Sequence, residues 1–164
     1  MNYGTVAGAD AYHAARGNVA WDGDQADKEI ALLRGSEYID YNFRSSFPGW
    51  KAQLRAQERE WPRSWAFDIE GNTIPIDEVP TEVEQATYEA AIRELANPGI
   101  LFPELSAPGR QIKRASVDGA VSVEYVGPMG IQSVTPIISI IRGILAPILT
   151  GQGGSSLAGQ SIRS

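Results

Sequence analysis

Cysteine is absent from the 164 residues, and histidine occurs once, at His13. Without cysteine the chain can form no disulfide, no thiolate metal site and no cysteine nucleophile. A zinc site would need further imidazole or thiolate ligands, and a catalytic pair built on His13 has no local partner. We therefore expect His13 to be a surface or partly packed helix residue. We also expect the chain to hold no metal or cofactor and to have no enzymatic activity.

Excess positive charge and long apolar runs are also missing. The formal net charge is −6, whereas a domain that binds duplex DNA usually carries a basic footprint. The longest apolar stretch, residues 136–149, covers 14 positions and is interrupted by Ser139 and Arg142. A membrane helix needs about 20 apolar residues. The first residues show no secretory pattern. We therefore expect a soluble protein with no membrane partner.

Capping residues and helix breakers predict a chain rich in helices. Aspartate and threonine mark expected starts, and Gly-Asn, Asn-Pro-Gly and proline mark expected ends. The predicted helices are Ala7–Arg16, a longer one from Asp22 or Asp24 to about Asp40, a short one at Lys51–Glu60, one from its cap Thr81 to Asn97, and one from Thr135 that is limited by Pro147.

The C-terminal third has a different pattern. Residues 112–125 alternate in polarity around Asp118-Gly119, which is typical of a β-hairpin with a two-residue turn. Residues 150–164 contain four glycines and four serines, the composition of a flexible linker. The predicted fold class is mainly α: a small helical bundle with one β-hairpin and an extended C-terminal segment. We divide the chain into a helical core (1–105), a link and hairpin (106–133), and an apolar helix with its tail (134–164).

One stretch, residues 44–63, suggests nucleic acid. It combines five basic residues with several aromatic ones, as surfaces that hold single strands do. A second interpretation is that the aromatic rings pack in the core and the arginines pair with acidic neighbours, which the negative net charge favours. The candidate contacts for a single strand are Arg44, Trp50, Lys51, Arg55 and Arg59.

An ordered set of motifs resembles a known family. The segments Asp27–Asp40, Phe47–Gly49, Glu60–Arg63 and Ile74–Pro80 are similar, in this order, to the head-to-tail adaptor (connector) proteins of tailed bacteriophages. The resemblance covers about Tyr3–Leu105. Overlapping phage sequences are labelled primosomal T-protein-like, single-strand DNA-binding proteins.

The resemblance implies a structural role in the virion, at the head–tail junction. Such adaptors form a ring, commonly of twelve identical subunits, beneath the portal protein. The ring extends the DNA channel used in genome ejection and docks the next neck or tail-terminator protein. DNA is expected to pass through the lumen without sequence-specific binding, because an acidic wall repels phosphate.

The same role gives the apolar C-terminal residues a function. An apolar helix is costly to leave in water, so we expect this segment to be buried against a neighbouring subunit. The tail that follows is expected to dock on the portal or an adjacent subunit. The predicted subunit and portal contacts are Ile137, Ile140, Ile141, Ile144, Leu145, Ile148, Leu157 and Ile162.

Overall fold

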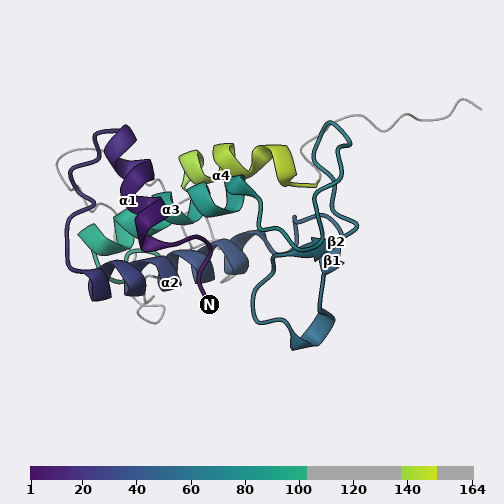
Figure 1. Cartoon of the computed structure of the whole chain (residues 1–164), viewed down its shortest axis with the longest axis horizontal. Coiled ribbons are helices and arrows are strands. Elements are labelled where there is room, and N and C mark those ends of the chain that lie inside the picture. Colours follow the sequence, from purple (N-terminus) through teal and green to yellow (C-terminus); the bar gives the residue numbers. More distant parts are fainter. Residues whose placement is uncertain (103–137, 151–164) are drawn as a thin grey trace, which may run out of the picture.

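The computed structural model of the chain describes residues 1–102 and 138–150, and the predicted mainly α fold is confirmed there (Figure 1). The described part contains four α-helices, two short strands and two 3-10 turns. They are α1 (Val6–Ala15), α2 (Gln25–Phe43), β1 (Trp50–Lys51), η1 (Leu54–Ala56), β2 (Arg63–Ser64), α3 (Thr81–Ala96), α4 (Ser139–Leu145) and η3 (Ala146–Ile148).

Local capping sets the helix starts. The side chain of Thr5 accepts a hydrogen bond from the Gly8 amide, and that of Asp24 accepts one from the Asp27 amide, so both act as N-caps. The start of α3 differs from the prediction by one residue. Pro80 takes the N-cap position of α3, and Thr81 is the first helical residue.

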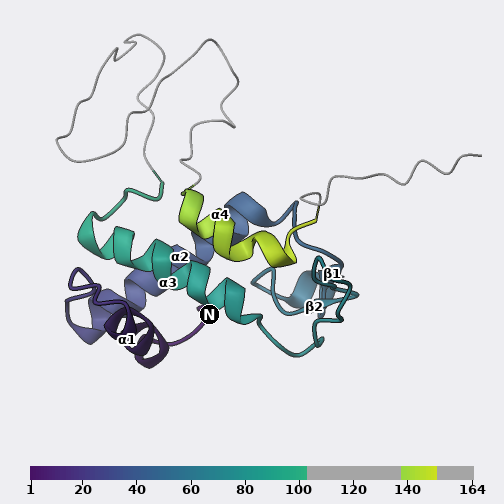
Figure 2. The same cartoon turned by 90° about the horizontal axis from the view of Figure 1, so that it is seen from above.

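Helix α3 lies between α2 and α4 (Figure 1). The contact between α2 and α3 is close because Gly35 has no side chain. A Cβ placed there would meet the carbonyl oxygen of Thr87 at 2.9 Å and the amide nitrogen of Ala91 at 3.2 Å. Helix α1 lies at one end of the molecule and the strand pair at the other, as the view from above also shows (Figure 2).

Helix α4 completes the interior of its own chain. Ile141 and Leu145 are fully buried, and Ile148 is almost fully buried, in one cluster with side chains of α2 and α3. The prediction that these three residues contact another subunit is therefore wrong, because their apolar surface is already covered within the chain. Ile144 packs partly against the same cluster, and Ile140 remains 45% exposed.

The described residues decide one further prediction, and several others lie outside them. The expected helix over Lys51–Glu60 does not form, and η1 is its only helical turn. The hairpin over 112–125, the helix start at Thr135, and the contact candidates Ile137, Leu157 and Ile162 lie outside the described residues. Within the described ranges, no helix combines the length and apolar character that crossing a membrane requires.

Candidate interaction surface

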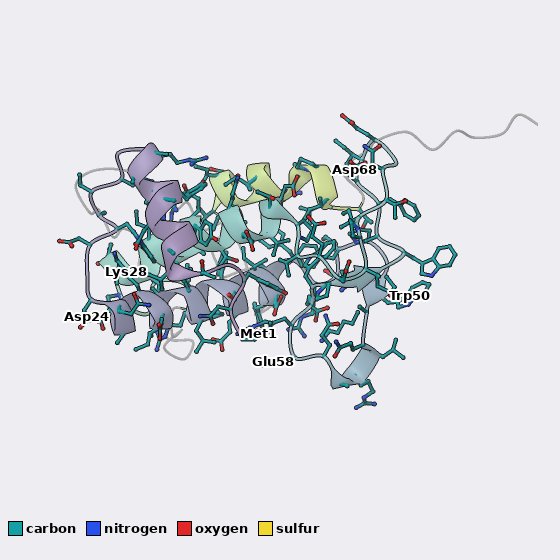
Figure 3. The ribbon with its side chains drawn as sticks, viewed as in Figure 1. Met1, Asp24, Lys28, Trp50, Glu58 and Asp68 are labelled. Atoms are coloured by element: carbon teal, nitrogen blue, oxygen red, sulfur yellow. The ribbon has the colours of Figure 1, made fainter. Side chains whose placement is uncertain are left out.

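Large apolar side chains are exposed at the end of the molecule that carries β1 and β2. We call this end the aromatic tip and define it by Trp50, Leu54, Trp65, Phe67 and Ile69. Trp50 is 52% exposed and Trp65 is 70% exposed. Figure 3 shows Trp50 at the far end of the molecule and Asp68 on a loop at the same end. Where exposed apolar side chains adjoin one another, as Trp50 and Trp65 do, they are candidates for a binding surface.

The two exposed tryptophans are held beside each other by the short strand pair. Trp50 pairs with Ser64 in the antiparallel register, and their neighbour Gly49 has a φ of +64°. A Cβ at Gly49 would lie 2.0 Å from the carbonyl oxygen of Ser64, so only glycine fits there. The Trp50 and Trp65 ring centroids are 6.2 Å apart, with the planes inclined by 31°.

Trp65 also has an unusual backbone. Its φ is +57°, in the left-handed region that residues with a side chain rarely adopt. Such conformations cost free energy and persist where the surrounding structure enforces them, often at functional sites. The left-handed backbone of Trp65 therefore coincides with a large apolar side chain that faces solvent.

A buried arginine fixes the base of the tip. The Arg63 guanidinium donates hydrogen bonds to the carbonyl oxygens of Pro48 and Gly49, each at 2.7 Å, and to a carboxylate oxygen of Glu60 at 2.9 Å. The side-chain amide of Gln57 donates to the carbonyl oxygens of Arg59 and Pro62. Charged hydrogen bonds in a buried setting are strong, so these bonds hold the backbone at the base of the tip in place.

A second buried network joins the tip to α2. The Tyr3 hydroxyl donates to Asp40 at 2.5 Å and accepts from the backbone amide of Trp61 at 3.0 Å. Arg59 donates to the other Asp40 oxygen at 3.4 Å. Burial raises the pKa of Asp40, although Tyr3 and Arg59 favour its ionised form. Burial likewise raises the pKa of the Tyr3 hydroxyl.

The predicted single-strand contacts do not form one surface. Arg59 is buried in the Asp40 network, so its assignment as a nucleic-acid contact is wrong. Lys51 lies 3.4 Å from a Glu60 carboxylate oxygen, and its charge is thereby paired. Trp50 and Arg55 are exposed within the tip region. Arg44 is exposed too, but it belongs to a different part of the surface.

Arg44 lines a shallow pocket of about 330 Å³ beside the C-terminal half of α2. Its lining mixes both charge signs with two aromatic rings: Glu37, Asp40, Tyr41, Arg44, Glu58, Arg59 and Phe102. Three carboxylates against two arginines give the pocket no excess of positive charge. It therefore does not extend a basic track toward the tip. Among the described residues, no cluster of three or more acidic or histidine side chains is arranged to hold a metal.

The aromatic residues of this region divide between interior and surface. Phe43, Phe47 and Trp61 are buried in the main core cluster, which confirms the packing interpretation for these three. Trp50 and Trp65 are exposed, which that interpretation did not anticipate. Trp65 was not among the predicted site residues, since nothing in its sequence neighbourhood separates it from Trp61.

The chain is similar to a known protein family. No curated protein and no solved structure matches the chain. A family model described as "Putative DnaT-like ssDNA binding protein" matches residues 2–163. Since this match extends over nearly the whole sequence, the chain belongs to that DnaT-like family.

Proposed function

We propose that the chain is a structural subunit of a tailed phage, a head-to-tail adaptor that forms a ring beneath the portal and works through contact surface. The observation that supports this most is the aromatic tip. Its exposed tryptophans stand on a buried frame, and their surroundings are acidic. Such a surface suits a protein partner, since aromatic side chains are enriched where proteins meet.

The charge around the tip favours protein over nucleic acid. Residues 50–80 contain four basic and six acidic side chains. Three of the four basic ones, Lys51, Arg59 and Arg63, lie within 4.0 Å of a carboxylate of the same chain. A surface that binds a phosphate backbone needs unpaired cations, because counterion release drives that binding. An acidic subunit is instead suited to let DNA pass.

The residues that carry the adaptor resemblance build the frame. Asp40 and Trp61 belong to the network with Tyr3, and Arg63 holds the base of the tip. Tyr38 and Ile39 are fully buried in the core. The resemblance thus lies in residues that determine the fold, which supports a shared framework with the adaptors.

Purified portal rings provide the test. We expect the chain to bind them, and ring-shaped density to extend the portal in electron micrographs. Replacing both Trp50 and Trp65 with serine should raise the subunit concentration needed for ring formation at least tenfold. This corresponds to a loss of about 1.4 kcal/mol or more of association free energy. The matched control is Ile30→Ser, which alters a similarly exposed apolar side chain on α2. No binding to portal rings, or equal assembly of both variants, would contradict the proposal.

A second candidate function is single-strand DNA binding. The specific observation in its favour is the Trp50–Trp65 pair, on which bases could stack, together with Arg55, which has no carboxylate within 4.0 Å among the described residues. The description of the matching family model points the same way. If the single strand binds at the tip, its affinity must depend on both tryptophans.

A further inference from the structure

The aromatic tip turns its large apolar side chains outward around a buried residue. Trp65 and Phe67 are exposed on either side of Ala66, which is fully buried, and Ile69 on the following turn is 63% exposed. The backbone between them is hydrogen-bonded within the chain, since the Ile74 amide donates to the carbonyl oxygen of Ala66 at 2.9 Å. The fold of the chain itself therefore sets the outward direction of these side chains.

Two tip side chains stand on an unusual backbone. Of the non-glycine residues that the structure describes, only Leu54 and Trp65 have a positive φ, at +52° and +57°. Both belong to the tip, and both side chains are largely exposed. Residues with a side chain adopt this conformation at a cost in free energy, and such residues gather at functional sites. This second observation also points to the tip as a contact surface.

The loop next to these side chains is acidic. Asp68 lies at the same end of the molecule as Trp50 (Figure 3), and Glu70 is exposed in the same loop. Hydrogen bonds from the side chain and the backbone amide of Asn72 lower the pKa of Asp68, so its carboxylate is charged at neutral pH. Among the described residues, neither Asp68 nor Glu70 has a lysine or arginine nitrogen within 4.0 Å.

The cations of this region do not neutralise the loop. Lys51 and Arg63 are both paired with Glu60, which leaves Arg55 as the exposed cation of the tip. Two copies of a chain with a net charge of −6 also repel each other. A partner with positive charge is attracted instead. A guanidinium is the most suitable cation, because it is attracted both by carboxylates and by the faces of tryptophan rings.

We propose that the aromatic tip binds a segment of another protein in which apolar side chains stand beside arginines. The apolar side chains pack on Trp50 and Trp65, and the guanidinium groups meet the carboxylate of Glu70. This binding rests on the proposed function only in that the tip is a protein contact. In an adaptor, the basic segment would belong to the portal or to the next neck protein and not to a second copy of the chain.

The four tryptophan indole N–H signals of the isotope-labelled full chain report such binding directly. The probe is a twelve-residue peptide that repeats Arg-Leu-Ser, added at about 0.15 M salt to screen long-range attraction. We expect the signals of Trp50 and Trp65 to shift, while those of the buried Trp21 and Trp61 stay in place. Replacing the leucines of the peptide with serine, or its arginines with glutamate, should weaken binding by about tenfold or more.

A charge exchange in the chain separates direct contact from general attraction. Glu70→Arg should weaken binding of the Arg-Leu-Ser peptide by about threefold or more and strengthen binding of the Glu-Leu-Ser peptide. The matched control is Glu37→Arg, the same change at an exposed position of α2, which should alter neither affinity. Dispersed indole signals in both variants check that the fold is intact.

The proposal is overturned if Trp50 and Trp65 do not respond to the Arg-Leu-Ser peptide, if the Glu-Leu-Ser peptide binds as tightly, or if Glu70→Arg acts like Glu37→Arg. A shift on raising the concentration of the chain alone would make a second copy the occupant. A response to a twelve-nucleotide oligothymidine but not to the peptide would make the occupant a single strand. Portal binding that depends on both tryptophans, without any response to the peptide, would leave the proposed function standing and remove only the partner assigned here.

Discussion

The only histidine in the chain is part of its interior. The Nε2 of His13 lies 3.2 Å from the carbonyl oxygen of Tyr88, and Nδ1 lies 3.0 Å from the side-chain amide nitrogen of Asn18. The neutral ring fits both partners when Nε2–H donates and Nδ1 accepts. A second proton on Nδ1 would face the Asn18 amide donor. Burial lowers the pKa of His13, and the charges of Arg16 and Arg93 act in the same direction, whereas Tyr88 and Glu89 oppose it.

This arrangement predicts a loss of stability in mild acid. Because the folded chain binds the His13 proton less readily than the unfolded chain, the stabilisation is complete above the unfolded pKa of about 6.5 and is lost as the pH falls through the lower folded value. Urea unfolding between about pH 5 and pH 7.5 should show this decrease. In His13→Gln the part of the slope due to this ring should vanish. An identical slope in the variant would contradict the assignment.

At the scale of elements, two glycines in helices should respond oppositely to the same substitution. Gly35→Ala should lower the free energy of unfolding by about 1–3 kcal/mol, because the new methyl group would press on the α3 backbone at Thr87 and Ala91. At Gly143 in α4 a Cβ would meet nothing within 4 Å. Gly143→Ala should therefore raise stability by about 0.5–1 kcal/mol. Denaturant unfolding of both variants measures the difference, and equal shifts would show that the α2–α3 contact is looser than described.

The helices could be predicted because their signals are local. Asp24 caps α2 three residues from its partner amide, and Asn97 ends α3 where Asn-Pro-Gly indicates. The tip could not be predicted in this way. The Gln- and Arg-rich residues 51–60 favour a helix by their composition, but the pairing of Trp50 with Ser64 and the hydrogen bonds of Arg63 impose a loop. Tertiary contacts override propensity there.

The contrast between local signals and tertiary contacts also explains which site residues could be predicted. Trp50 was among the predicted contacts, and its exposure agrees with a contact role. Arg59 was placed there by its charge, yet its partner Asp40 lies 19 residues away in sequence. Trp61 and Trp65 differ only through the fold, since Trp61 is held by Tyr3, 58 residues away, and Trp65 by its left-handed backbone. A sequence pattern registers charge and aromatic content but not which of these groups are already paired.

At the scale of the whole molecule, the balance of paired and unpaired charge separates the two candidate functions. The stretch 44–63 contains five basic residues. Of these, only Arg44 and Arg55 have no carboxylate within 4.0 Å among the described residues. Each phosphate neutralised on a single strand adds about −0.7 to the slope of log affinity against log salt concentration. Two free arginines therefore allow a slope no steeper than about −1.4, and the net charge of −6 works against even this.

We therefore expect weak binding to a fluorescent single strand in an anisotropy titration, with little dependence on salt. Any remaining affinity should come from stacking and should fall when Trp50 and Trp65 are both replaced by serine. Arg55→Ala should make the slope shallower by about 0.7, whereas Arg142→Ala on α4 should leave it unchanged. A steep slope would require cations that this fold has not committed to its own carboxylates. Since Lys51, Arg59 and Arg63 are so committed, that result would favour the single-strand candidate over the adaptor and place its binding site away from the tip.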